Sequence, residues 1–237
     1  MITAFCFCRV QAQSPFFTSI QVDFEKTVSV HQLMKSVEPE WFETSKDHMP
    51  VEVKSYFSFT GDTAQSIYRQ TKEPVITPGM WFNPIADNNI VYNSYGTGRT
   101  ITQKPVFEQT FLVDDSLLNI KWKITGDTRV IAGYECRKAV GIIFDSVAVF
   151  AFYADELMVP GGPEGIHGLP GMILGVGVPK IHTTWFATRV AVNVHSDKMV
   201  PEKKGKKVNR REMIDAINKV MKDWGGYGKN LVMNYLI

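Results

Sequence analysis

The sequence predicts a mainly β protein, α+β at its margin, in which antiparallel strands form one sheet and a C-terminal helix packs on it. From about Ser19 onward, short segments rich in Val, Ile, Phe and Tyr alternate with clusters of Gly, Asp, Asn and Ser. The connections are mostly short, and loops of two to four residues cannot carry a parallel crossover. With 237 residues, of which 44% are hydrophobic, the chain can bury a sizeable core.

The strand-like segments follow one another from residue 20 to residue 178. In 20–30, IQVDFEKTVSV, a period of two places Val22 and Phe24 on one face and Asp23 and Glu25 on the other. Segment 55–70 is typical of a strand, a Gly-Asp turn at 61–62 and a second strand. Segment 106–155 carries three further turn signals, at 114–115, 126–127 and 145–146.

Two regions interrupt this pattern, and a helix follows it. Residues 31–50 have helical composition with two prolines and predict a helical turn or an insertion over one end of the sheet, whereas 71–105 predict an irregular strand pair. In 208–226, VNRREMIDAINKVMKDWGG, Asn209 can cap a helix with Glu212 three residues on. An apolar stripe along that helix predicts docking on the sheet; it comprises Met213, Ile214, Ile217, Val220, Met221 and Trp224.

Residues 1–14, MITAFCFCRVQAQS, resemble the end of a secretory signal peptide that lacks its basic start; a plain apolar first strand is the alternative. We therefore expect one domain over 15–237. Cleavage would remove Cys6 and Cys8 and leave Cys136 alone, so that no disulfide could form within the mature chain.

Charge and composition exclude several classes of function. The formal net charge is +2, which gives no signature of nucleic-acid binding, and no apolar run reaches the length of a membrane span. The stretch 198–211 contains seven Lys and Arg residues; a solvated connection is the simpler interpretation, and a patch for acidic surfaces is the alternative. The five histidines show no short ligand spacing, so that we predict neither a metal nor a cofactor, although folding could bring His167 and His182 together.

Cys136, Lys138 and His167 are weak candidates for catalysis. A thiol beside a lysine two residues on can have a lowered pKa and act as a nucleophile. A lone cysteine in a strand is more often a core residue, and no Cys-His-Asn signature surrounds this one. The sequence therefore favours a protein that is not an enzyme.

The stretch 162–178, GPEGIHGLPGMILGVGV, ends a connection of about seventeen residues that is longer than most loops in compact domains. Pro170 and Gly171 fit the centre of a type II turn, in which glycine supplies a positive φ. The continuously apolar segment 172–178 predicts a strand covered on both faces. We expect structural roles for Gly133, Gly162, Pro163, Gly168, Pro170 and Gly171.

Three blocks of the chain resemble the GLPGLI family, secreted proteins of Bacteroidetes. They are IAGYECRKAV at 131–140, VFAFYADELMVPGGPEGIHGLPGMIL at 149–174 and VPEKKGKKVNRREM at 200–213. Phe152 stands where that family commonly has Trp, Met158 and Val159 replace Ile-Pro, and Met172 replaces Leu. The resemblance implies a periplasmic, secreted or outer-membrane-associated protein, often encoded near TonB-dependent transporters, and a strongly curved sheet like that of lipoprotein-carrier domains.

That family has no established activity to carry over, and our own expectation is non-catalytic binding of an apolar or peptide-like ligand, or of a cell-envelope partner, at a groove bordered by the 155–171 loop. The candidate ligand-binding residues are Tyr134, Phe152, Tyr153, His167 and Leu169. Two alternatives stay open: a thiol- or histidine-dependent hydrolase, and an assembly or accessory factor for an outer-membrane transporter.

Overall fold

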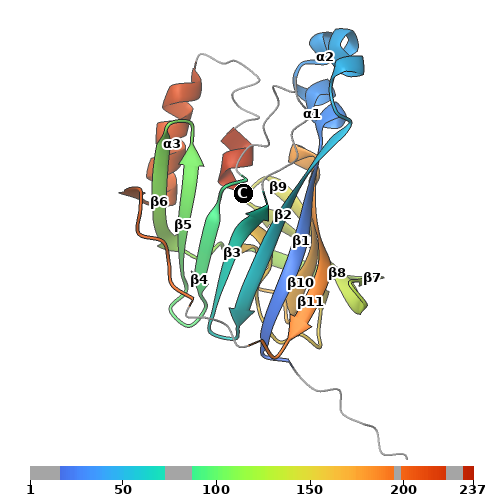
Figure 1. Cartoon of the computed structure of the whole chain (residues 1–237), viewed down its shortest axis with the longest axis vertical. Helices are drawn as coiled ribbons and strands as arrows, with labels where there is room; N and C mark the ends of the chain where they lie inside the picture. Colours follow the sequence, from blue (N-terminus) through green and yellow to red (C-terminus); the bar gives the residue numbers. More distant parts are fainter. Residues whose placement is uncertain (1–16, 73–86, 195–198, 223–231) are drawn as a thin grey trace, which may run out of the picture.

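The computed structural model describes residues 17–72, 87–194, 199–222 and 232–237, in which twelve strands form one sheet (Figure 1). The strands lie in the order β12-β6-β5-β4-β3-β2-β1-β11-β10-β9-β8-β7. Neighbours are antiparallel except β12 and β6, which are parallel. The strands are β1 (Ser19–Ser29), β2 (Glu52–Asp62), β3 (Gln65–Lys72), β4 (Ile90–Ser94), β5 (Arg99–Val106), β6 (Gln109–Ser116), β7 (Lys121–Ile131), β8 (Tyr134–Ile143), β9 (Val147–Ala154), β10 (Met172–Val178), β11 (Thr183–Val192) and β12 (Lys206–Val208).

Helices α1 (Val30–Val37), α2 (Pro39–Ser45) and α3 (Arg210–Met221) lie at two places along the sheet, and residues 232–236 are helical as well. Helices α1 and α2 form the insertion between β1 and β2, which confirms the helical prediction for 31–50. Helix α3 packs against β6. Short 3₁₀ turns occupy η1 (Lys46–His48), η2 (Pro163–Gly165) and η3 (Pro179–Ile181). None of the described helices is long and apolar enough to cross a bilayer.

The sheet is mainly antiparallel, as predicted, but it is neither strongly curled nor closed, because β12 and β7 form separate edges. The expected strongly curved carrier-like sheet is therefore wrong. Side chains of the 155–171 loop fill the space that a carrier would leave hollow. Leu157, Val159, Ile166 and Leu169 are all buried there in the main core.

The predicted segments differ from the structure mainly at the turns. The signal at 145–146 is correct, and β10 is buried on both faces as expected. The two other signals in 106–155 are wrong, because 114–115 lie within β6 and 126–127 within β7. Gly126 and Asp127 lie where the pairing of β7 with β8 shifts register, between Ile124 and Thr128. This irregularity is of the β-bulge kind and is not a turn.

Region 71–105 forms the β4–β5 hairpin over 90–106, whereas 73–86 lie outside the described residues, as does the expected signal peptide at 1–14. Helix α3 begins at the predicted cap, where Asn209 and Glu212 form a capping box. Met213, Ile217 and Met221 bury their side chains against Val106, Phe111 and Val113 in a second core cluster. Val220 stays exposed, and Trp224 lies outside the described residues.

Candidate functional site

The structure keeps the three catalytic candidates apart. Cys136 is fully buried in the main core, and its thiol donates to the Tyr134 carbonyl oxygen, at 3.5 Å. Burial raises the pKa of Cys136 to about 11, and the charges of Glu156 and Glu135 act in the same direction. A thiol that stays protonated at neutral pH is a poor nucleophile.

Lys138 and His167 each have other neighbours. The Lys138 ammonium pairs with Asp127, with 3.0 Å between Nζ and Oδ2, at the surface of the β7–β8 hairpin. The His167 ring lies 6.2 Å from that of Tyr95, and the His167 carbonyl accepts a hydrogen bond from Trp122 Nε1 at 2.9 Å. These contacts make the histidine part of the anchor of the 155–171 loop.

The predicted ligand-binding residues serve mainly as packing. Tyr153 and Leu169 belong to the main core, and Tyr134 and Phe152 pack against its border. Gly133 forms part of the β7–β8 turn, and Gly162 and Pro163 lead into η2. Gly168 has a positive φ of 94°, whereas Gly171 does not have the positive φ that a type II turn requires.

Instead, the 155–171 loop brings an acidic residue into the interior. Glu164 lies in η2 with φ 53° and ψ 27°, and only 7% of the residue is exposed. Its Oε2 accepts a hydrogen bond from Asn89 Nδ2 at 3.3 Å, and its Oε1 has no hydrogen-bond partner among the described residues. Burial raises the pKa of Glu164, against the attraction of Lys26 and Lys104.

Lys104 faces Glu164 from β5. This strand alternates, so that Thr100, Thr102 and Lys104 point inward, and the Lys104 ammonium donates to main-chain oxygens of Tyr235 at 2.6 Å and Ile237 at 2.9 Å. Burial lowers the pKa of Lys104 to about 8, although Glu164 favours the charged form. These hydrogen bonds offset part of the cost of burying the amine.

A second buried ionic group lies beside the first. Lys26 Nζ is 2.7 Å from Asp87 Oδ1, and Asp87 Oδ2 also accepts the hydroxyl hydrogen of Ser55. The Lys26 ammonium also lies 5.5 Å from the ring of Trp185. Burial raises the pKa of Tyr68 far above its usual value, and the charges of Glu164 and Asp87 add to this effect.

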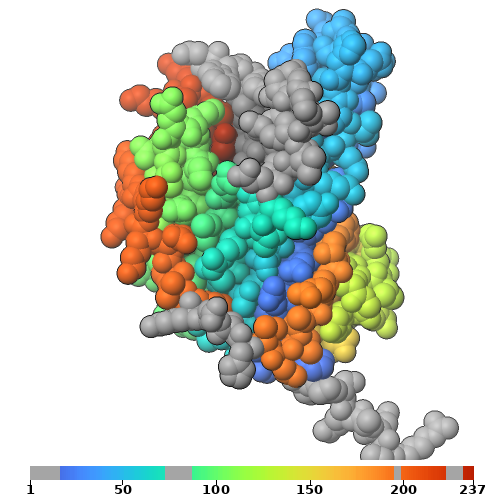
Figure 2. All heavy atoms as spheres, viewed as in Figure 1, coloured from blue at the N-terminus to red at the C-terminus, as the bar shows by residue number. Residues whose placement is uncertain are grey.

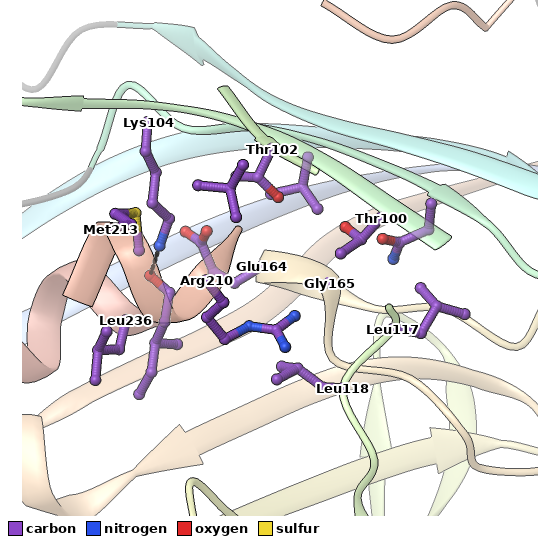
Figure 3. Close-up of a pocket in the computed structure, with 14 residues that line it drawn as sticks. Thr100, Thr102, Lys104, Leu117, Leu118, Glu164, Gly165, Arg210, Met213 and Leu236 are labelled. Atoms are coloured by element: carbon purple, nitrogen blue, oxygen red, sulfur yellow. Dashed lines mark hydrogen bonds between the residues drawn. The ribbon is translucent and has the colours of Figure 1, made fainter. Parts of the chain in front are cut away.

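Lys104, Glu164 and Arg210 converge on a cavity of about 50 Å³ (Figure 3). Arg210, the first residue of α3, donates from Nη2 to the Ser116 carbonyl oxygen at 2.9 Å and lies 3.9 Å from an Asp115 carboxylate oxygen. The other lining residues mix polar and apolar side chains; they are Val91, Asn93, Thr100, Thr102, Val113, Leu117, Leu118, Gly165, Met213, Leu236 and Ile237.

The cavity offers both acceptors and donors. Glu164 Oε1 and Asn93 Oδ1 are buried acceptors without a partner among the described residues. Lys104 uses two of the three N–H groups of its ammonium on main-chain oxygens. In the described part of the chain, no three His, Cys, Asp or Glu side chains lie together as metal ligands would.

Sequence reasoning missed Lys26, Lys104 and Glu164. Two of them carried a signal, because Lys26 occupies an inward position of β1 between Phe24 and Val28, and Lys104 occupies the inward position of β5 before Val106. A lysine on the apolar face of a strand indicates a buried charge with a partner. Glu164 lies in a loop, where no periodicity could mark it.

No family model matches the chain, and no curated protein matches it. The fold is similar to two structures of PNGF-II. In the P21 space group the TM-score is 0.53 at 14% identity, and the match covers 88% of this chain and 34% of that chain. In the C2 space group the TM-score is 0.50 at 15% identity, and the match covers 88% of this chain and 33% of that chain. This chain therefore spans about a third of the length of PNGF-II. An uncharacterized conserved protein from Thermus thermophilus matches with a TM-score of 0.38 at 9% identity, over 81% of this chain and 90% of that one.

Proposed function

We propose that the protein is a non-catalytic binding protein that takes a small neutral polar group of a peptide-like ligand into the Lys104–Glu164–Arg210 cavity. One observation carries this proposal. Glu164 is buried in a left-handed backbone conformation, and one carboxyl oxygen without a partner among the described residues lies at a cavity that also contains two cations. Strained backbone and unpaired buried polar atoms cost free energy and concentrate at functional sites.

The cavity volume limits the size of the bound group. A cavity for a whole drug-sized molecule or a lipid is about 300–1,000 Å³. This cavity measures about 50 Å³, room for about three to five water molecules, at roughly 10–15 Å³ for each water-sized probe. It therefore suits one functional group of a larger ligand and not the apolar body of a carried lipid.

The charges favour a group without net charge. A cation would meet Lys104 and Arg210, and an anion would meet the unpaired oxygen of Glu164. Arg210 is already near the Asp115 carboxylate. Burial acts to raise the pKa of Asp115, but hydrogen bonds from the main-chain N–H groups of Arg210 and Ser116 outweigh burial and lower it. An amide can donate to Glu164 and Asn93 and accept from Lys104, so that it matches both kinds of lining group.

The resemblance to the GLPGLI family supports a proposal about the setting. The blocks that carry it lie on β8, on β9 with the following loop and β10, and on β12 with the start of α3, and the last two of these contribute lining residues to the cavity. On this basis we propose membership of that family, a periplasmic or outer-membrane-associated location, and a role beside an outer-membrane transporter as the second candidate. The buried Cys136 thiol gives no support to a thiol hydrolase.

Nuclear magnetic resonance titration with three small probes tests the binding proposal. Acetamide should shift the backbone amide signals of Gly165 and Thr102, whereas acetate and methylammonium should shift them much less. Glu164→Leu removes the acceptor and should abolish the acetamide effect, and Glu135→Leu at an exposed site should leave it intact. A larger response to either ion would contradict the neutral-group proposal, and no response to any probe would contradict binding at this cavity.

A further inference from the structure

A second hollow lies where α3 meets the β5–β6 turn, and it shares no lining residue with the cavity. It is a groove of about 430 Å³ between the β5–β6 turn, β12 and the helix. The lining is largely apolar, with one lysine and one glutamate; it comprises Val106, Phe107, Glu108, Gln109, Phe111, Lys206, Ala216, Ile217 and Val220. We call these residues the α3 groove.

Two large apolar side chains remain exposed at this groove. Val220 is 57% exposed, because the buried stripe of α3 runs through Met213, Ile217 and Met221 and leaves Val220 on its flank. Phe107 is 48% exposed at the β5–β6 turn, where its φ is 52°. A bulky residue in the left-handed region of a turn is rare, because Asn and Gly fit that conformation at lower cost.

A basic rim adjoins the α3 groove through Lys206, the one residue of this rim that lines the groove among the described residues. Lys203, Lys204, Lys206, Lys207 and Arg211 are exposed, and no ion pair joins any of them to an acidic group within the described residues. In Figure 2, residues 199–208 form an orange ridge beside the green β5 and β6. Glu108 is the one acidic side chain that lines the groove among the residues that the structure describes.

The rim is held in place rather than free in solvent. Residues Lys206–Val208 pair with Phe111, Leu112 and Val113 of β6 as the edge strand β12. The Lys204 carbonyl accepts a hydrogen bond from Gln103 Nε2 at 2.8 Å. A solvated connection, the simpler interpretation from the sequence, needs no such anchoring, so that the structure favours a fixed charged surface.

We propose that the α3 groove and its basic rim bind an acidic amphipathic segment of a partner protein. Apolar side chains of the segment enter the groove between Val220 and Phe107, and its carboxylates pair with the lysines of the rim. The apolar surface is concave, which suits the side chains of a peptide, whereas a membrane surface requires apolar groups that protrude.

Fluorescence anisotropy with a designed peptide tests this proposal. The probe is a short labelled helix with leucines spaced three and four apart and glutamates elsewhere. We expect saturable binding that weakens as salt is raised. Val220→Asp, which places a carboxylate in the groove, should weaken binding at least about tenfold. Val51→Asp is the matched control, because Val51 is an exposed valine, 64% exposed, that does not line the groove.

A second pair of variants tests the charges. Lys206→Glu with Lys207→Glu should weaken binding and flatten its salt dependence, whereas Lys121→Glu with Lys123→Glu, on the opposite edge strand β7, should change it much less. Equal binding of a peptide with the same composition in scrambled order would overturn the proposal, and so would equal loss in both charge variants. Binding to phosphatidylglycerol vesicles that Val220→Asp abolishes, without peptide binding, would identify a membrane surface instead.

Discussion

Gly171 lies against the main chain of the strand that precedes the 155–171 loop. A Cβ atom added at this position would overlap the carbonyl oxygen of Ala154 and approach its carbonyl carbon to 2.8 Å. Both of these atoms belong to the backbone, which cannot move without disturbing the β9–β10 pair. The glycine is therefore required by close approach and not by a positive φ.

Gly171→Ala should consequently destabilise the protein by about 2–3 kcal/mol, the usual cost of overpacking against rigid atoms. Urea unfolding followed by circular dichroism measures this difference. Gly96→Ala is the control, because a Cβ atom there meets nothing within 4 Å. Equal stability of the two variants would contradict the close approach.

At the same scale, the sequence indicates where charges are buried but not what they do. Lys26 and Lys104 can be found from the period of two in their strands, since each is a charged residue at a position that the alternation places on the buried face. The Asn89 side chain that binds Glu164 lies 75 residues away along the chain, and no local pattern joins such a pair. The burial of Lys104 could therefore be predicted from the sequence, whereas the cavity itself could be found only in the folded structure.

Among the elements, α3 shows how strongly local chemistry sets a boundary. The Asn209 side chain accepts a hydrogen bond from the Glu212 N–H at 2.9 Å, and the Glu212 carboxylate accepts one from the Asn209 N–H at 2.9 Å. Both interactions join residues three apart, so that the sequence alone predicts the first turn of the helix. The strand turns were harder to predict, because Asp114-Asp115 and Gly126-Asp127 both lie within long strands, where pairing along the rest of the strand outweighs the local turn preference.

Asn209→Ala removes one half of this capping box and should cost about 1 kcal/mol of the free energy of unfolding. Asn218→Ala, at an exposed position within α3, is the control, and it should change stability by less than about 0.5 kcal/mol. Thermal unfolding of the two variants under identical conditions gives the comparison. If Asn218→Ala proves as costly as Asn209→Ala, the cap is not what stabilises the start of the helix.

Over the whole molecule, the 155–171 loop joins parts of the sheet that are distant in the strand order. It follows β9, yet the His167 ring contacts Tyr95, which directly follows β4, and Trp122 of β7 donates to the His167 carbonyl. Mainly antiparallel strands and a docked helix could be predicted from local periodicity. The open sheet and the burial of this loop in the core could not be predicted, because both rest on contacts between residues that are far apart in the sequence.

The His167 anchor should make stability depend on pH. Burial lowers the pKa of His167, although a hydrogen bond to the Leu118 main chain opposes the shift. The unfolded chain therefore binds a proton near its ordinary value of about 6.5 while the folded chain stays neutral, so that acid favours unfolding. As pH falls below about 6.5, the wild type should lose stability at up to about 1.4 kcal/mol per pH unit until the folded histidine also titrates.

His167→Gln keeps a side-chain N–H and removes the titration, so that its stability should fall less between about pH 7.5 and about pH 5.5. Urea unfolding at the two values measures the difference, and it should be read against His48→Gln, which changes an exposed histidine. Burial also lowers the pKa of His182. Any loss of stability with falling pH that His182 causes should therefore remain in the His167 variant. An identical loss of stability in the wild type and in His167→Gln would show that protonation of His167 does not cause the pH dependence.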